Sequence, residues 1–349
     1  MSLKRLLKWL GFFLGLIIGI FLLLLLVPEK ETIAKLQPRG STEYWEMSEG
    51  FRIAYTHLSG IDSINKTPVI FLHGGPGGYV HSSSIKTFAS LAEIGHDVYL
   101  YDQRGSGLSD RMSKYSDINL NKHLSDLHEI IKQKIKAPKV ILIGQSFGSI
   151  IISQYSAQHP ETIDKIVFSS PGALRPHRQI NGNYVDLDSI YLAPDSLLFK
   201  TPYYFVKDVD NMAMKPKAIA ASVGALIFNK KFISDKQMDR MLNTLASQFT
   251  KGMVADPKNV LPEEGGGRLY AYMATNSDDF PEIRDKINSV TAPILVIQGQ
   301  YEYHSYGVAY EYVDLYPNGK YRFIENAGHE IWWEQEVEYV KVIKDFLNE

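Results

Sequence analysis

The clearest chemical signal in the sequence is the pentapeptide Gly144-Gln145-Ser146-Phe147-Gly148. It follows the apolar run 140–143 and precedes a stretch of helical character at 150–159. A serine between two glycines at a sharp strand-to-helix turn is typical of a nucleophile elbow, because the glycines leave room for the crowded backbone and the hydroxyl stays exposed above the sheet. The pattern predicts that Ser146 is a nucleophile.

A serine hydroxyl needs a base to take its proton and an acid to orient that base. Glu302 follows the apolar run 294–297, and His329 follows the run 321–324. Both residues come at the carboxyl ends of expected parallel strands, where ligands meet an open sheet. We expect His329 to be the general base and Glu302 to be the carboxylate that orients it. His304 is the less favoured base, because it precedes the last strand.

A glycine-rich loop, His73-Gly74-Gly75-Pro76-Gly77-Gly78, follows the apolar run 68–72. At this place in the chain, backbone N–H groups can point at a developing oxyanion. We expect the N–H groups of Gly75 and Phe147 to form an oxyanion hole, and His73 to be a buried hydrogen-bonding prop. A phosphate-binding loop is the rival interpretation, but the segment lacks a Walker lysine and the G-x-G-x-x-G pattern.

The glycine-rich loop, the serine elbow and the segment Tyr101-Asp102-Gln103-Arg104-Gly105-Ser106-Gly107 together resemble the proline iminopeptidase group of the α/β-hydrolase superfamily. The resemblance covers about residues 50–171 and 289–349. It implies an α/β-hydrolase fold with an inserted helical cap, and a serine peptidase that removes N-terminal residues, typically proline, from short peptides. It also implies that Asp102 and Arg104 are structural.

The sequence departs from that family in its elbow, its acid and its insertion. Gln145 and Phe147 stand where glycine and tryptophan are common, and Glu302 stands where aspartate is usual. The family's cap usually has a Trp-Glu pair, and the carboxylate of that pair helps to hold the substrate amine. The insertion of this chain contains no such pair. Glu263 and Glu264 are the candidate substrate-binding acids of this insertion, with solvated surface acids as the alternative.

Several aromatic residues are further candidates for the substrate pocket. Tyr301 or Tyr303 is expected at its mouth. Others lie in the insertion, where they form either an apolar substrate wall or the core of the cap: Tyr203, Tyr204, Phe205, Tyr270 and Tyr272.

Three functions remain open on these residues. They are an aminopeptidase, an esterase or lactonase-like hydrolase of small acyl substrates, and a non-catalytic binding module that would be expected to have lost one of the reacting groups. No metal or organic cofactor is expected, because histidines and acids do not fall at ligand spacing. A nucleic-acid partner has no electrostatic support at a net charge of −2, and the oligomeric state stays open.

The elements that must position these groups alternate along the chain. Short apolar runs alternate with segments whose apolar residues recur at helical spacing. The runs are 68–72, 97–101, 140–143, 165–168, 294–297 and 321–324. This alternation predicts an α/β fold with a mostly parallel sheet and helices on both faces. The alternating stretch 51–58 is expected to be an antiparallel edge strand, and the rhythm breaks between about residues 171 and 288.

The N-terminal segment differs from the rest in composition. Residues 9–27 carry no charge, and at about 1.5 Å per residue they span about 28 Å as a helix, close to the ~30 Å of a bilayer core. No small-residue cleavage site follows, so an uncleaved anchor is favoured over a signal peptide. Lys4, Arg5 and Lys8 precede the run, which favours a cytoplasmic N-terminus and an exported catalytic part.

These patterns divide the 349 residues into four parts. Residues 1–27 form the cytoplasmic N-terminus and the membrane anchor, and 28–43 form a polar tether. Residues 44–171 and 289–349 form the hydrolase core, and 172–288 form a cap inserted into it. The chain has no cysteine, which excludes a disulfide scaffold, a thiolate metal site and a cysteine nucleophile.

Overall fold

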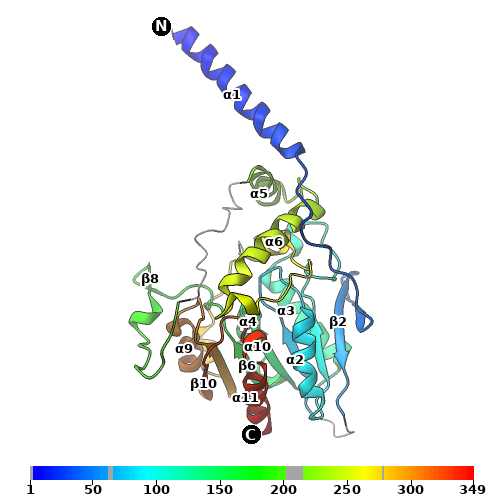
Figure 1. The fold of residues 1–349 in the computed structure, drawn as a ribbon, viewed down its shortest axis with the longest axis vertical. Helices are drawn as coiled ribbons and strands as arrows, with labels where there is room; N and C mark the ends of the chain where they lie inside the picture. The colour runs from blue at the N-terminus through cyan, green and yellow to red at the C-terminus, as the bar shows by residue number, and fades with distance from the viewer. Residues whose placement is uncertain (1–2, 62–65, 202–214, 277–278) are drawn as a thin grey trace.

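An eight-stranded, mostly parallel sheet lies at the centre of the computed structural model, which describes residues 3–61, 66–201, 215–276 and 279–349 (Figure 1). The strand order is β1-β2-β4-β3-β5-β6-β9-β10. β2 pairs antiparallel with β1 and β4, and the remaining pairings are parallel. The strands are β1 (Thr42–Glu46), β2 (Arg52–Leu58), β3 (Val69–Leu72), β4 (Val98–Tyr101), β5 (Val140–Gln145), β6 (Ile163–Ser169), β9 (Ile294–Gly299) and β10 (Gly319–Ile324).

The predicted α/β fold is confirmed, and each of the six apolar runs forms a strand of this sheet. β2 is antiparallel as expected, but it is not the edge strand. β1 covers it, and β1 begins at Thr42, inside the range expected for the tether. The rings of Trp45 in β1 and Tyr55 in β2 stack with centroids 3.8 Å apart, a cross-strand aromatic pair that stabilises the added strand.

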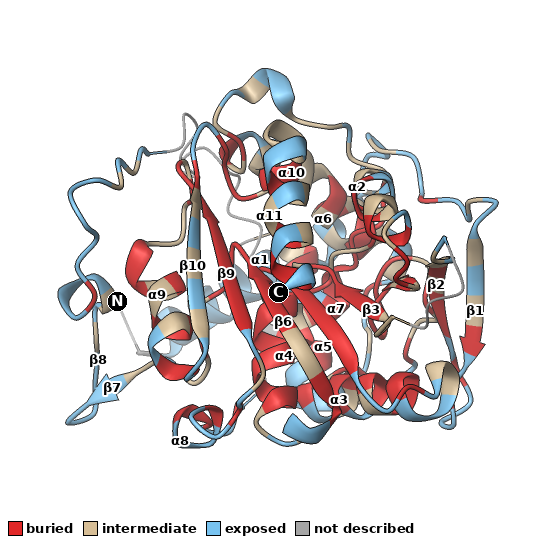
Figure 2. Ribbon diagram, turned by 90° about the horizontal axis from the view of Figure 1, so that it is seen from below, coloured by how far each residue is buried: buried red, intermediate tan, exposed pale blue. Residues whose placement is uncertain are grey.

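Helices cover both faces of the sheet, and alternate residues of one strand enter two different cores. Ile70 and Leu72 of β3 lie in one buried cluster with α3, α4 and α9, while Val69 and Phe71 lie in the other with α2 and α11. Figure 2 shows the central strands coloured as buried between these layers. These helices are α2 (Ser82–Ala92), α3 (Leu120–Glu129), α4 (Phe147–Ser156), α9 (Tyr306–Leu315), α10 (Ile331–Glu334) and α11 (Glu336–Asn348).

The stretch between β6 and β9 contributes no strand to the central sheet in its described part. We refer to residues 172–288 as the cap. It contains a small hairpin of β7 (Gln179–Ile180) and β8 (Asn183–Tyr184), and the helices α5 (Pro216–Phe228), α6 (Asp235–Phe249), α7 (Leu269–Asn276) and α8 (Arg284–Ile287). α6 and α7 pack against each other, and α6 lies above the sheet in Figure 1.

The N-terminal helix α1 (Leu3–Leu26) projects away from the rest of the molecule (Figure 1). Its segment Lys4–Leu26 is long enough to cross a membrane. The most apolar 18-residue window of that segment has a mean hydropathy of 2.8, and none of the window is buried. Length and composition of this kind suit a membrane anchor and a signal sequence alike.

Candidate active site

Ser146 lies at the turn between β5 and α4, at the carboxyl edge of the sheet. Its backbone has φ 51° and ψ −114°, a conformation that side-chain-bearing residues rarely adopt and that marks a strained turn. The flanking glycines make this turn possible. A Cβ on Gly148 would lie 2.2 Å from the carbonyl oxygen of Leu72, and one on Gly144 would lie 2.7 Å from the carbonyl carbon of Gly148.

His329 and Glu302 form a buried pair at the ends of the two last strands. Nδ1 of His329 lies 2.8 Å and 2.9 Å from the two carboxylate oxygens of Glu302, and both side chains are buried. β9 and β10 run parallel in register, so the loops that follow them emerge side by side. The backbone N–H of His304 donates a further hydrogen bond to Glu302 at 3.1 Å.

The charges of this pair set its protonation. Burial alone would lower the pKa of His329, but the charge and hydrogen bond of Glu302 outweigh burial and raise that pKa above 6.5. Burial alone would raise the pKa of Glu302, but attraction to His329 lowers it to about 2. Glu302 is therefore ionised at neutral pH and holds a proton on Nδ1, which leaves Nε2 as the basic nitrogen.

Tyr303 lies between this pair and Ser146. Its hydroxyl lies 3.2 Å from Nε2 of His329, and the Ser146 side chain lies beside the same phenol. The Tyr303 ring packs against the His329 ring with centroids 4.4 Å apart. Burial raises the pKa of Tyr303 well above 10, so the phenol keeps its proton at neutral pH. Tyr303 therefore contacts the expected base and lies beside the expected nucleophile.

The residues expected to form the oxyanion hole border the same cavity as Ser146. Phe147 is the first residue of α4, so its N–H has no acceptor within the helix and lies at the positive end of the helix dipole. The glycine-rich loop packs closely beside the serine, because a Cβ on Gly74 would lie 3.0 Å from Cβ of Ser146. Gly75 has φ 131°, a conformation that favours glycine.

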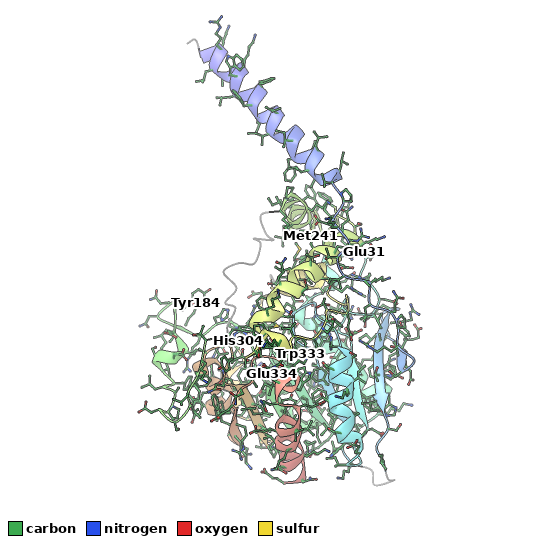
Figure 3. The ribbon with its side chains drawn as sticks, viewed as in Figure 1. Glu31, Tyr184, Met241, His304, Trp333 and Glu334 are labelled. Carbon is green, nitrogen blue, oxygen red and sulfur yellow. The ribbon has the colours of Figure 1, made fainter. Side chains whose placement is uncertain are left out.

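The cavity above Ser146 has a volume of about 530 Å³. Its wall is mostly apolar and comes from both the core and the cap, with α6 supplying Leu242, Leu245 and Phe249. His304 and Trp333 also border it, and Figure 3 shows them near the middle of the body beneath α6. A cavity of this size, with a few polar groups converging in an apolar wall, suits a small organic or short peptide ligand.

The comparisons with known proteins agree with this geometry. A family model described as the alpha/beta hydrolase fold matches residues 67–336. The chain is an α/β hydrolase. This α/β hydrolase is 25% identical to a proline iminopeptidase of Saccharolobus solfataricus over 80% of this chain and 84% of that protein. It is 26% identical to a proline iminopeptidase of Heyndrickxia coagulans over 81% of this chain and 91% of that protein.

Among solved structures, an esterase from Exiguobacterium antarcticum superimposes with a TM-score of 0.58, at 16% identity, over 88% of this chain and 99% of the esterase. This likeness shows the fold. With the proline iminopeptidase relatives, the family model supports the predicted identity of the chain as a serine hydrolase enzyme.

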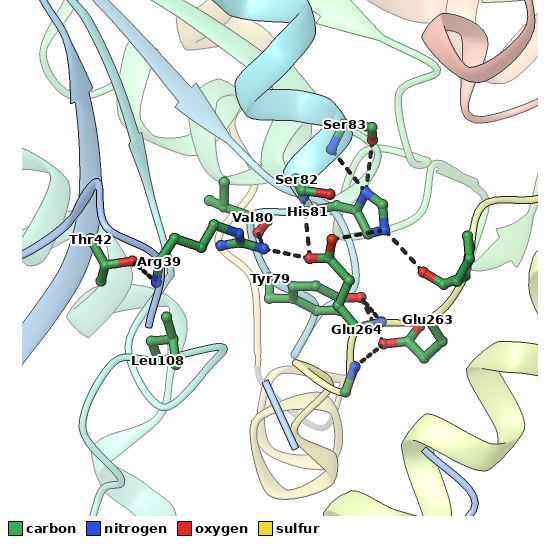
Figure 4. A network of polar contacts seen from close by, with 12 residues as sticks. Arg39, Thr42, Tyr79, Val80, His81, Ser82, Ser83, Leu108, Glu263 and Glu264 are labelled. Atoms are coloured by element: carbon green, nitrogen blue, oxygen red, sulfur yellow. Dashed lines mark hydrogen bonds and ion pairs between the residues drawn. The ribbon is translucent and has the colours of Figure 1, made fainter. Parts of the chain in front are cut away.

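The acids predicted to bind substrate occupy different places in this α/β hydrolase. Glu263 borders the cavity, where it accepts hydrogen bonds from the Tyr79 hydroxyl at 2.7 Å and the Gly265 N–H at 3.0 Å. Glu264 turns toward the tether instead, pairing with Arg39 and lying 3.6 Å from His81 (Figure 4).

Of the aromatic candidates, Tyr303 and Tyr272 line the cavity, whereas the Tyr301 ring lies beside the Lys200 ammonium. Tyr270 is 2% exposed and belongs to the core of the cap. The remaining three aromatic candidates lie outside the described residues: Tyr203, Tyr204 and Phe205.

The residues expected to be structural are buried among polar partners. Nε2 of His73 accepts the Gln103 N–H at 3.1 Å, and burial lowers the His73 pKa to about 4, which keeps the ring neutral. The Asp102 carboxylate accepts the N–H groups of Val80 and Leu108, each at 2.7 Å. These contacts tie the glycine-rich loop and the loop after β4 to each other beside the active site.

Glu330 is a cavity residue that the sequence analysis did not single out. It directly follows His329, and Gln145 Nε2 lies 3.4 Å from its carboxylate. Burial raises the pKa of Glu330 to about 7. Glu330 and Tyr303 share a sequence signal, since each immediately follows a residue of the predicted triad and so lies on a loop at the carboxyl edge of the sheet.

Proposed function

We propose that this chain is a membrane-anchored serine hydrolase that works through an acyl-enzyme and releases N-terminal residues from short peptides. The single observation that carries the chemistry is the buried Glu302–His329 pair on the same cavity as Ser146. The choice of an aminopeptidase is supported by the proline iminopeptidase relatives, which match most of the chain.

In the proposed reaction, Oγ of Ser146 attacks the substrate carbonyl while Nε2 of His329 takes the hydroxyl proton, and Glu302 holds the imidazolium. The carbonyl oxygen becomes negative and is held by the N–H groups of Gly75 and Phe147. The C–N bond then breaks, and the leaving amine takes the proton from His329. A water molecule deprotonated by His329 attacks the acyl-enzyme, which releases the acid product and restores Ser146.

A peptide with a free N-terminus brings an ammonium group, and a carboxylate in an apolar cavity is a favourable partner for it. Glu330 is the acid we assign to this role, because it adjoins His329 and a pKa of about 7 lets an incoming ammonium ionise it fully. Glu263 is the second candidate on the cavity wall. Glu264 and Tyr301 do not line the cavity, so this proposal gives them no direct contact with the substrate.

The anchor belongs to the same proposal. Lys4, Arg5 and Lys8 precede the apolar part of α1, so the N-terminus stays in the cytoplasm and the catalytic part is exported. Retention in the membrane fraction after an alkaline wash, together with digestion of the catalytic part by protease added outside intact cells, is the expected result. Release of the chain by the wash would contradict the anchor without bearing on the catalysis.

A fluorophosphonate probe tests the catalytic proposal directly. We expect the wild-type chain to be labelled and Ser146→Ala not to be, with hydrolysis reduced on the order of 10⁶-fold. A wild-type chain that resists the probe would favour a non-catalytic binding module.

A substrate panel then separates the two hydrolase classes. Prolyl, alanyl and leucyl anilides with free amines are compared with their N-blocked forms and with short acyl esters. We expect cleavage of the free-amine anilides to dominate. Equal or faster cleavage of N-blocked anilides or acyl esters would replace the aminopeptidase by an esterase or lactonase-like hydrolase.

A further inference from the structure

The cap helix α5 exposes large apolar side chains along one face. Ile219, Val223, Leu226 and Ile227 follow one another at helical spacing and are 37%, 39%, 63% and 70% exposed. At the carboxyl end of the helix, Phe228 and Phe232 are also exposed beside Gly224, and their rings stack with centroids 5.4 Å apart. We call these six residues the α5 apolar face. Single exposed apolar residues are ordinary, but a contiguous exposed patch marks a surface that meets an apolar partner.

The opposite face of α5 carries small side chains. Ala218, Ala221, Gly224 and Ala225 are buried against the cap. A Cβ on Gly224 would lie 2.7 Å from the carbonyl oxygen of Lys230, so this side of the helix approaches its neighbours closely. In a helix that serves only the core of a soluble domain, the larger apolar side chains face inward. α5 has the reverse arrangement, so its outer face is not explained by packing within the cap.

α5 lies where the apolar helix α1 leaves the body of the molecule (Figure 1). The buried ammonium of Lys217 in α5 hydrogen-bonds the carbonyl oxygen of Val27 and lies 3.6 Å from the Glu29 carboxylate. Phe21 and Leu25, on the last turns of α1, pack against the buried cluster that includes α5. The tether continues this attachment along α6, where Glu31 pairs with Arg240 (Figure 3).

These contacts place the α5 apolar face at the level where a membrane-spanning α1 would emerge from the bilayer. We propose that the α5 apolar face lies in the interface of the lipid bilayer that α1 spans, so that the cap is docked on the membrane surface. This inference rests on the proposed anchor and is independent of the proposed catalysis. Because the α5 apolar face adjoins the end of the membrane-spanning α1, the partner that we assign to this face is lipid.

The length of α5 supports an interfacial position. Its 13 residues cover about 20 Å at about 1.5 Å per residue, too short for the ~30 Å hydrocarbon core. A short helix that buries small side chains against the cap, exposes large apolar ones and has no acidic residue is suited to lie in the membrane plane with its exposed face at the boundary between headgroups and acyl chains. Lys230, exposed just beyond the helix, suits the headgroup level.

The absence of cysteine from the chain allows a direct test on the full-length protein. Ile227→Cys is labelled with an environment-sensitive fluorophore and reconstituted into phosphatidylcholine–phosphatidylglycerol vesicles. The matched control is Val337→Cys, because Val337 is also apolar and 85% exposed but lies on α11, which packs against α2, α10 and β10. Fluorophosphonate labelling of both variants reports that the fold is retained.

We expect the label at position 227 to emit at shorter wavelength than the label at 337, and to be quenched by spin labels on the lipid acyl chains. Vesicle flotation that carries the chain while both labels stay in a water-like environment would overturn the docking and leave the anchor intact. The label at 227 could instead be shielded from water but not quenched by spin labels on the acyl chains. That result would identify a second copy of the chain as the occupant of the α5 apolar face, and it would also overturn the membrane docking. If the chain did not float with the vesicles, that result would contradict both the membrane anchor and the docking of the cap.

Discussion

The hydroxyl of Tyr303 lies 3.2 Å from Nε2 of His329, the nitrogen that accepts the Ser146 proton in the proposed reaction. The Ser146 side chain lies beside the same hydroxyl. The phenol therefore lies between the proposed nucleophile and the proposed base. Tyr303 also directly follows Glu302, so a single loop carries both the acid of the triad and this phenol.

Replacing Tyr303 by phenylalanine tests that contact. We expect Tyr303→Phe to lower kcat about tenfold with little change in KM, because the loss of one hydrogen bond to a group that becomes charged is worth about 1.5 kcal/mol. The measurement is steady-state kinetics on the preferred anilide, with Tyr301→Phe as the matched control outside the cavity wall. An unchanged or raised kcat would show that the phenol merely occupies Nε2 in the resting enzyme.

The pH dependence of Ser146 reactivity should follow His329. The base works only when neutral, and its pKa is raised above 6.5, so reactivity is present above that pKa and is lost as the pH falls through it. The rate of fluorophosphonate labelling against pH is the suitable measurement, because the probe has no ionising group. We expect the midpoint of the acid limb to lie above pH 6.5.

Glu302→Gln should shift that limb in a defined direction. The charge that raises the His329 pKa is removed while the burial that lowers it remains, so the midpoint moves to lower pH. The plateau rate should fall by about 10⁴-fold, because an amide does not hold the imidazole in the required tautomer. A midpoint that stays in place would mean that a group other than His329 sets the limb.

Glu330→Gln should affect only substrates with a free amine. The loss of a charge-assisted hydrogen bond worth about 1.5–3 kcal/mol corresponds to a fall of about 10- to 150-fold in kcat/KM for free-amine anilides. Short acyl esters, which bring no ammonium, should be cleaved as before. Glu263→Gln is the matched variant in the same cavity, and a larger effect there would transfer the amine-binding role to Glu263.

Arg104 should be essential for stability rather than for chemistry. Its guanidinium, 2% exposed, donates to both oxygens of the Asp126 carboxylate at 2.8 Å and 2.6 Å and to Glu49 at 2.8 Å. Arg104→Ala leaves Asp126 buried without its partner, which should lower the free energy of unfolding by about 3–5 kcal/mol. Urea denaturation of the full chain in detergent micelles measures this loss.

A surface pair provides the control for that measurement. Lys341 and Asp345 form an ion pair at 2.6 Å, but their side chains are 72% and 62% exposed. We expect Lys341→Ala to change the free energy of unfolding by no more than about 0.5 kcal/mol. Similar losses for Arg104→Ala and Lys341→Ala would contradict a structural role for the buried network.

The central sheet was accessible from the sequence because its strands are buried on both faces and appear as short continuous apolar runs. β3, β5 and β9 are examples, and each has four buried residues or more. β1 escaped notice because Trp45 is its only buried residue, it lies in a polar segment, and it pairs only with β2. Its membership of the sheet depends on contacts such as that between Trp45 and Tyr55, which no local pattern reveals.

The sequence by itself predicted the three proposed reacting groups, because Ser146, Glu302 and His329 each follow a recognisable apolar run, and parallel strands end at one edge. Only the tertiary structure decided that Tyr303 contacts His329, that Glu330 borders the cavity while Glu264 pairs with Arg39, and that α5 exposes large apolar side chains. Local patterns report which residues are apolar or reactive. Which of them meet, and which face solvent or membrane, depends on packing between segments far apart in the chain.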